Sequence, residues 1–219
     1  TSAWNLFLSP LSKETLLEVL LMSRVIGTTG SIAVGKSTVT QYLKTHGYCV
    51  LDADEISHQA IEKESHCYHQ IVECFDCLDD NQNISRQKLG QIVFHDHQQK
   101  ALLESIIHPY VQDMLKKGIE QCQEPLVFLD VPLLYETHMD TMCDDVMVVY
   151  VDEKTQLKRL MKRNQIDEKQ ARLLMSQQIS IEKKKEMGDY IIDNRQNFED
   201  LYVQIERVLE VLKNEIVRH

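Results

Sequence analysis

The chain has 219 residues and a formal net charge of −10, and 43% of its residues are hydrophobic. These values are typical of a globular protein with a buried core, and the acidic balance argues against a general nucleic-acid or membrane-surface binder, whose binding face would be basic. No stretch of the sequence reaches the roughly 18 apolar residues of a membrane span. We therefore expect a cytoplasmic protein, a monomer or small homo-oligomer, with no nucleic-acid or membrane partner.

Predicted strands and helices alternate along the chain. Short apolar runs predict five strands, at residues 24–28, 48–51, 126–129, 146–151 and 190–192. Helices are predicted at 36–44, from 54 to 121 with a polar break at 79–85, and from Asn197 as N-cap to the end. This alternation predicts an α/β fold with a doubly wound parallel five-stranded sheet. The helix-rich insert at about 55–121 is too long for one crossover, so we expect it to form a small subdomain.

Residues 1–21 precede the first convincing strand. Their apolar run is interrupted by Glu18, and they lack the basic start and the uncharged apolar stretch of a signal peptide. We expect an N-terminal extension of unknown role, followed by one domain over 22–219.

Six cysteines stand at irregular spacings along the chain. A secreted disulfide framework would be denser and more regular. Cys74 and Cys77 form a Cys-x-x-Cys pair, but no second pair exists to complete a zinc site. Reduced thiols are the better interpretation of this cluster.

Residues 30–37 read Gly-Ser-Ile-Ala-Val-Gly-Lys-Ser and fit the phosphate-binding pattern G-x-x-x-x-G-K-[ST] without a mismatch. The pattern follows an apolar strand and precedes a helix, the context in which backbone N–H groups and a helix N-terminus bind phosphate. Lys36 would then reach the β- and γ-phosphates, and Ser37 would hold Mg²⁺. The alternative is a glycine-rich turn that binds nothing. The motif predicts nucleotide binding but does not identify the reaction.

Carboxylates follow two of the predicted strands. Asp52 and Asp54 come directly after the second strand, and Asp130 ends a Walker B-like run that would place it near Mg²⁺. Carboxyl ends of parallel strands line the ligand crevice, so an aspartate there could accept the proton of an attacking hydroxyl. Alternatively, either Asp52 or Asp54 only caps the next helix. The guanine-reading N-K-x-D element of GTPases does not occur.

A basic stretch runs from Lys154 to Lys185, with ten Lys or Arg and three Asp or Glu, which gives about +7 inside an acidic protein. Such a local reversal of the sign of the charge indicates binding of a phosphate-sized anionic ligand. The alternative is a solvated helical face.

Several blocks together resemble the dephospho-CoA kinase family, in that family's order and over about nine-tenths of the chain. They are residues 27–39, 52–56, 89–94, 107–109, 130–136, 156–163, 178 and 191–194. The resemblance implies a P-loop kinase in which the ribose 3′-hydroxyl of dephospho-CoA attacks the γ-phosphate of ATP, giving coenzyme A and ADP. Mg²⁺ is the implied cofactor, and about 153–186 is the implied lid.

The resemblance also implies roles for individual residues. Asp54 would be the base or hydroxyl-orienting residue, Lys36 with Mg²⁺ would neutralise charge, and Arg163 would lie on the lid over ATP. The ATP-binding residues would be Gly30, Ala33, Val34, Gly35, Lys36, Ser37, Thr38, Arg163 and Asn194, the last near adenine. The residues assigned to the acceptor substrate would be Asp54, His108 and Gln178.

Departures from the family pattern leave alternatives open. Gln112 stands where the family often has Arg, and Thr29-Gly30-Ser31 stands where a Gly-Gly pair is usual. His108 has a plain alternative, because Pro109 suits the first position of a helix and His108 would then only precede it.

Two other functions remain compatible with the motifs. One is another small-molecule P-loop kinase, such as a nucleoside or nucleotide kinase, which would share the loop, the aspartate and the basic lid. The other is a non-catalytic nucleotide-binding protein, in which Asp54→Asn would leave function untouched.

Overall fold

The computed structural model describes residues 23–216, so the predicted extension at 1–21 lies outside the described residues. Its centre is a five-stranded sheet in which all pairs are parallel. In spatial order the strands are β2 (Cys49–Asp52), β3 (Leu126–Asp130), β1 (Arg24–Thr29), β4 (Asp145–Tyr150) and β5 (Tyr190–Asp193). The predicted fold class is confirmed.

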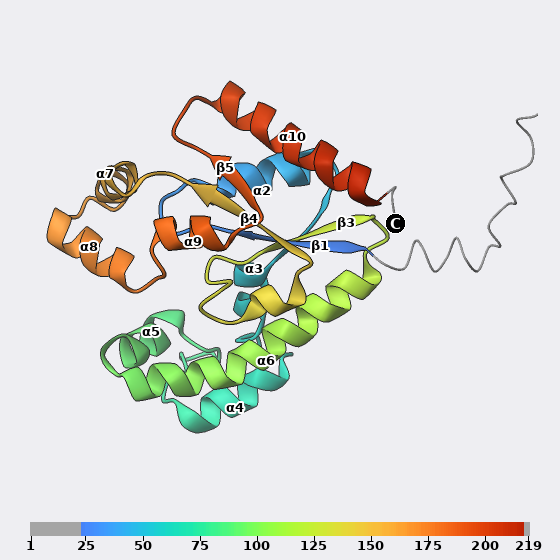
Figure 1. Cartoon of the computed structure of the whole chain (residues 1–219). Helices are drawn as coiled ribbons and strands as arrows, with labels where there is room; N and C mark the ends of the chain where they lie inside the picture. The colour runs from blue at the N-terminus through green and yellow to red at the C-terminus, as the bar shows by residue number, and fades with distance from the viewer. Residues whose placement is uncertain (1–22, 217–219) are drawn as a thin grey trace, which may run out of the picture.

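Helices cover both faces of this sheet (Figure 1). α10 (Phe198–Ile216) and α2 (Lys36–Thr45) lie on one face, and α3 (Ala53–Gln59) and α6 (His97–Gln121) lie on the other. All five residues of β3 are buried, as expected for a strand covered on both sides. α10 buries one stripe of leucines and isoleucine at helical spacing: Leu201, Ile205, Leu209 and Leu212.

A helical lobe hangs below the sheet in Figure 1 and contains α4 (His66–Cys74), α5 (Arg86–His95) and part of α6. It has its own apolar cluster, separate from the core around the sheet. The buried members are Ala60, Cys67, Tyr68, Ile71, Phe75, Cys77, Ile84 and Leu89. The polar break predicted at 79–85 lies between α4 and α5, where Leu78 and Ile84 form an isolated antiparallel bridge. The lobe therefore packs around apolar residues of its own.

Three further helices connect β4 to β5: α7 (Glu153–Asn164), α8 (Glu168–Ser176) and α9 (Ile181–Met187). α7 and α8 lie beyond the carboxyl ends of the strands, whereas α9 packs against β4 (Figure 1). Each begins at a side chain that caps its first turn. Asp152 accepts from Thr155 N–H, and Asp167 forms a reciprocal capping box with Gln170. This is the segment in which the lid was predicted.

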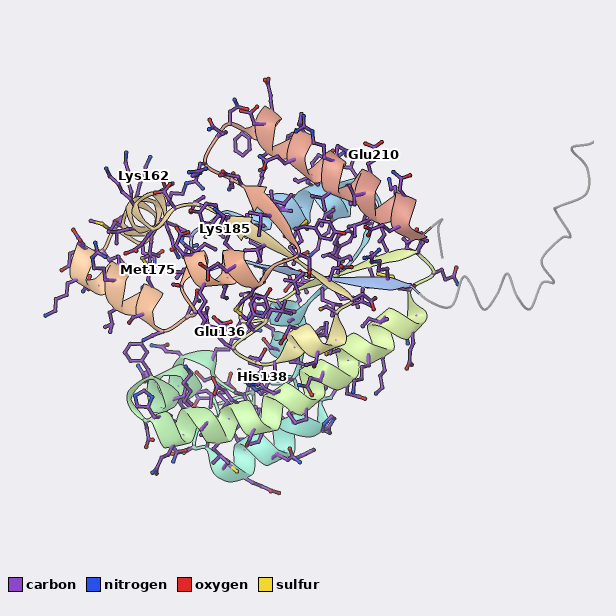
Figure 2. All side chains as sticks on the ribbon, viewed as in Figure 1. Glu136, His138, Lys162, Met175, Lys185 and Glu210 are labelled. Atoms are coloured by element: carbon purple, nitrogen blue, oxygen red, sulfur yellow. A yellow bond between two sulfur atoms is a disulfide. The ribbon has the colours of Figure 1, made fainter. Side chains whose placement is uncertain are left out.

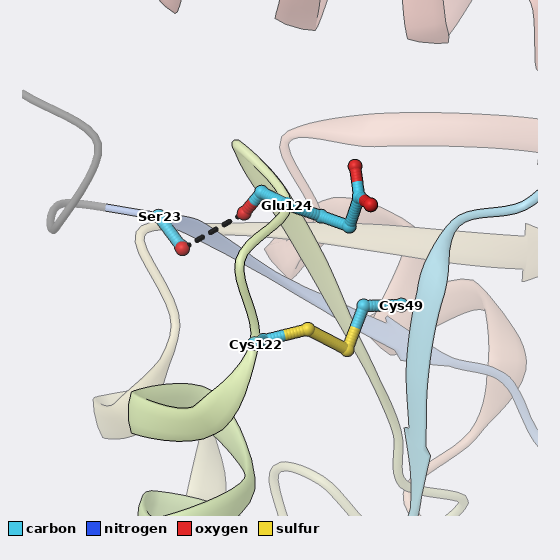
Figure 3. The surroundings of a disulfide bond; sticks show 4 residues. All are labelled: Ser23, Cys49, Cys122 and Glu124. Carbon is cyan, nitrogen blue, oxygen red and sulfur yellow. Dashed lines mark hydrogen bonds between the residues drawn. A yellow bond between two sulfur atoms is a disulfide. The ribbon is translucent and has the colours of Figure 1, made fainter.

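A disulfide joins Cys49 at the start of β2 to Cys122 just after α6 (Figure 3). This bond could not be predicted from the sequence, because the two cysteines are 73 residues apart and match no spacing pattern. The expectation of reduced thiols concerned the cluster at Cys74 and Cys77, and both of these cysteines are free. The remaining two cysteines are free as well.

In residues 23–216, no helix is both long and apolar enough to cross a membrane.

Candidate active site

The phosphate-binding motif forms the turn between β1 and α2. Ala33 has φ 65° and Gly35 has φ 89°, so two residues of the loop occupy the left-handed region. A Cβ on Gly35 would lie 2.2 Å from Nδ2 of Asn194, so only glycine fits there. The loop curls as a phosphate-binding turn requires, with α2 beginning at Lys36.

Side chains from other elements fix the shape of this loop. Gln178 Oε1 accepts a 2.8 Å hydrogen bond from Ile32 N–H, and Gln156 Nε2 donates a 2.9 Å bond to the carbonyl oxygen of Ile32. Asn194 Nδ2 donates a 2.8 Å bond to the carbonyl oxygen of Val34. These polar groups hold the loop in its binding shape before any ligand arrives.

A cavity of about 910 Å³ opens over the loop. The lining residues are Gly30, Ser31, Ile32, Ala33, Val34, Gly35, Lys36, Ser37, Thr38, Asp54, Pro132, Arg159, Arg163, Gln178, Asn194, Gln196, Asn197 and Phe198. Every residue predicted to bind ATP is among them. Arg159, Gln196, Asn197 and Phe198 were not predicted as site residues, since only the fold brings α7 and the start of α10 to this wall.

Lys36, which lines this cavity, forms an ion pair with Asp130. Burial lowers the pKa of Lys36 to about 8, while the carboxylates of Asp54 and Asp52 act in the opposite direction. Asp130 is only 4% exposed, so its charge is shielded from water. The P-loop ammonium thus lies among three carboxylates.

The oxygen donors near Lys36 fit a magnesium ion. Mg²⁺ prefers hydroxyl, carboxylate, water and phosphate oxygens and takes few protein ligands. Ser37 and Asp130 supply one hydroxyl and one carboxylate, while the described part of the chain contains no cluster of three or more His, Cys, Asp or Glu that could hold a metal alone. The donor set therefore suits an ion that arrives with a nucleotide.

Asp52 and Asp54 have different surroundings. Asp52 Oδ1 accepts from the N–H groups of Asp54 and Glu55 and caps α3. Asp54 caps nothing; its side chain faces the cavity, and burial raises its pKa against the opposing charge of Lys36. The capping alternative applies to Asp52 alone, and Asp54 remains available for chemistry.

A second cavity of about 240 Å³ lies between α3, α6 and the loop after β3. Most of its lining is apolar: Ala53, Leu103, Ile107, Val111, Val131, Pro132, Leu133 and Met139. The polar lining residues are Asp54, Ser57, Glu104, His108 and Thr137. Asp54 and Pro132 line both cavities, so the two spaces meet at these residues.

The structure separates the residues expected to contact the acceptor. Asp54 and His108 line the second cavity, whereas Gln178 lies against the P-loop and lines the first cavity but not the second. Pro109 lies inside α6 instead of at its start, which is a correction to the alternative interpretation of His108. His108 is therefore a helical residue that faces a cavity.

The basic stretch divides into two sets. Arg159 and Arg163 line the first cavity, and Arg163 Nε also donates to the side chain of Asn164. Arg172 instead pairs with Glu153 and Glu168 on the exposed surface. Arg172 therefore fits the interpretation as a solvated face, and Arg159 and Arg163 stay candidates for binding an anionic ligand.

Comparisons with known proteins identify relatives of this chain. The family model described as dephospho-CoA kinase matches residues 24–200. A dephospho-CoA kinase from Oceanobacillus iheyensis is 41% identical over 194 residues, which cover 86% of this chain and 98% of that protein.

Two solved structures are similar to the whole fold. One, from Thermus thermophilus, has a TM-score of 0.74 and 28% identity, covering 88% of this chain and 97% of its own. The other, a dephospho-CoA kinase from Campylobacter jejuni, has a TM-score of 0.69 and 28% identity, covering 89% of this chain and 100% of its own. With a P-loop, a strand-end aspartate and these relatives, the chain belongs to the dephospho-CoA kinase family.

Proposed function

We propose that this protein transfers the γ-phosphate of ATP to the ribose 3′-hydroxyl of dephospho-CoA, giving coenzyme A and ADP. One observation carries the proposal: Asp54 and Pro132 line both cavities, so a nucleotide in the first and an acceptor in the second would meet at Asp54. Family membership identifies the acceptor, because the geometry alone would fit other small alcohols.

The P-loop would bind the phosphates of ATP through its backbone N–H groups and the N-terminus of α2. Lys36 would exchange its contact with Asp130 for the β- and γ-phosphates, where its charge stabilises the transition state. Arg159 and Arg163 would close the outer wall of the cavity and exclude water.

Asp54 would orient the acceptor hydroxyl and accept its proton at a carboxylate oxygen as the new P–O bond forms. Burial raises the pKa of Asp54, which makes its carboxylate a better proton acceptor than an exposed aspartate. His108, across the second cavity, would contact the acceptor.

We assign Ser37 and Asp130 as the residues that hold Mg²⁺ when nucleotide is bound. When bound, Mg²⁺ would supply positive charge that offsets the negative charge of the nucleotide phosphates. Asp130 contacts Lys36 in this structure, and its carboxylate would be available to the ion once Lys36 contacts the phosphates.

The decisive experiment measures ADP release from Mg·ATP with dephospho-CoA, and separately with a panel of nucleosides and nucleoside monophosphates. We expect turnover with dephospho-CoA alone, with coenzyme A identified as product by mass. Turnover with another acceptor would support the assignment as a kinase and reject dephospho-CoA as its substrate. ATP binding without turnover on any acceptor would favour a non-catalytic protein.

A cytoplasmic location and a monomeric or small homo-oligomeric state stay predictions from the sequence.

A further inference from the structure

One charged residue of the basic stretch points into the protein. Lys184 on α9 has a side chain that is 0% exposed, and the mechanism above gives it no role. Its ammonium lies 2.9 Å from Glu136 Oε1 and donates a 2.9 Å hydrogen bond to the carbonyl oxygen of Pro132. A cation at this depth therefore acts on protein groups and does not face the anionic ligand expected of the lid.

The partners of Lys184 are shared with other segments. The Pro132 carbonyl also accepts a 3.1 Å bond from Thr29 Oγ1 at the end of β1, and Glu136 Oε1 also accepts a 2.9 Å bond from Ile179 N–H. Figure 2 places Glu136 between the sheet and the helical lobe. The pair thus connects α9, the loop after β3, the end of β1 and the segment before α9.

Both ends of this network reach the candidate active site. Pro132 is one of the two residues that line both cavities. Ile179 follows Gln178, and its carbonyl oxygen accepts a 3.1 Å bond from Ser31 Oγ in the P-loop. Movement of Lys184 or Glu136 would therefore displace the boundary between the two cavities and the support of the P-loop together.

Stability alone is a weak reason for such a pair. Burial lowers the pKa of Lys184, and only Glu136 opposes this shift, so the charged form is held at a cost in desolvation. Replacing a buried ion pair with well-packed apolar residues is often neutral or stabilising. An apolar pair, however, could not fix the position of the Pro132 carbonyl, because it could not donate a directed hydrogen bond.

We propose that Lys184 and Glu136 are a positioning pair for phosphoryl transfer, which holds the Pro132 segment so that the nucleotide and acceptor cavities meet at the correct separation. The inference rests on the proposed function, since it concerns the geometry of transfer between two bound substrates. Reactions of this kind are sensitive to distance: a misplacement of about 1 Å can lower the rate about a hundredfold.

The test compares Lys184→Met with Lys183→Met, an exposed neighbour on the same helix. For each variant, ATP affinity is measured by calorimetry, and kcat and the acceptor KM are measured per ATP-binding site, so that unfolded molecules do not count. For Lys184→Met we expect kcat to fall at least about tenfold and the acceptor KM to rise, with ATP affinity changed less than about threefold. Lys183→Met should match the wild type.

Glu136→Gln provides a second, milder variant should Lys184→Met fail to fold. It keeps the shape and the acceptor for Ile179 N–H but removes the charge that pairs with Lys184. We expect the same separation of effects, with kcat reduced and ATP affinity kept.

Wild-type values of kcat and acceptor KM in both variants, even with a lower melting temperature, would overturn the proposal and leave the pair structural. If the wild-type enzyme turns over a different acceptor, that result would reject dephospho-CoA as the substrate and not the role of the pair. The same variants would then be compared on that acceptor.

Discussion

The side-chain amide of Asn194 donates a 2.8 Å hydrogen bond to the carbonyl oxygen of Val34, joining the end of β5 to the phosphate-binding loop. Asn194 is buried, and its amide occupies the space that a Cβ on Gly35 would need. Two residues separated by 160 positions thus define the same turn. That Asn194 lies near adenine stays a prediction, and its contact with the loop predicts a role in shaping the nucleotide site.

Replacing Asn194 with alanine should weaken ATP binding. The variant loses a buried hydrogen bond and leaves the Val34 carbonyl with only a 3.5 Å contact from Arg159, a loss of about 1 kcal/mol, or about fivefold in affinity. Calorimetric titration with ATP measures this change. The control is Asn214→Ala on the exposed side of α10, which should bind like the wild type. Unchanged affinity in Asn194→Ala would show that the loop keeps its shape without this bond.

Substitution of Gly35 with alanine should abolish nucleotide binding, because the new Cβ would overlap Asn194 and the φ of 89° disfavours any side chain. Gly90 in α5 offers a matched control, since a Cβ there meets no atom within 4 Å. Gly90→Ala should retain ATP binding and stabilise the fold by about 0.5–1 kcal/mol. Thermal denaturation with and without ATP separates the two: only Gly35→Ala should lose the ligand-induced rise in melting temperature. A normal rise in that variant would contradict the steric argument.

The sequence predicted the sheet and the phosphate-binding loop because their signals are local. Leu126–Asp130 is an uninterrupted apolar run ending in aspartate, and residues 30–37 carry their own spacing pattern. The site residues that were missed depend on contacts distant in sequence. Gln156 supports the P-loop across 124 positions, and no local pattern distinguishes it from an exposed helical glutamine.

The basic stretch shows the same limit. Ten cations within Lys154–Lys185 predict a positive segment, but not which side chains point inward. Lys184 and the exposed Lys183 are adjacent and identical in type, and only the packing of α9 on the sheet buries the first. The Cys49–Cys122 bond was missed for a related reason, since pairing depends on the approach of β2 to the end of α6.

The disulfide should be detectable chemically. Alkylation of the denatured, unreduced protein should modify four of its six cysteines and leave Cys49 and Cys122 unmodified. Labelling of all six would show that the bond is absent from the protein as prepared. Mass spectrometry of the peptides distinguishes these outcomes.

Loss of this bond should also destabilise the fold. Cys122→Ser should lower the free energy of unfolding by about 2–4 kcal/mol, because the bond closes a long loop in the unfolded chain. Denaturant titration under non-reducing conditions measures the change. Cys74→Ser, at an exposed free cysteine, is the control and should lie within about 0.5 kcal/mol of the wild type. Equal stability of the two variants would contradict a stabilising bond.

The pH dependence of kcat/KM should report the ionisation of Asp54. Burial raises the pKa of this carboxyl above the ordinary value of 3.8, and Asp52 raises it further. The base must be deprotonated to accept a proton, so kcat/KM should fall as the pH is lowered through the raised pKa of Asp54. The midpoint of this acid limb should therefore lie above that of an exposed aspartate.

Two substitutions separate Asp54 from its neighbour. Asp54→Asn should lower kcat by about 10²–10⁴-fold, keep ATP affinity and remove the Asp54-dependent part of the acid limb. Asp52→Asn keeps a good N-cap for α3 and should retain most activity, but its acid limb should move to lower pH, because one charge that raises the pKa of Asp54 is gone. Ionisation of ATP itself is common to all three enzymes and cancels in the comparison. An acid limb that is identical in the wild type and Asp54→Asn would exclude Asp54 as the proton acceptor.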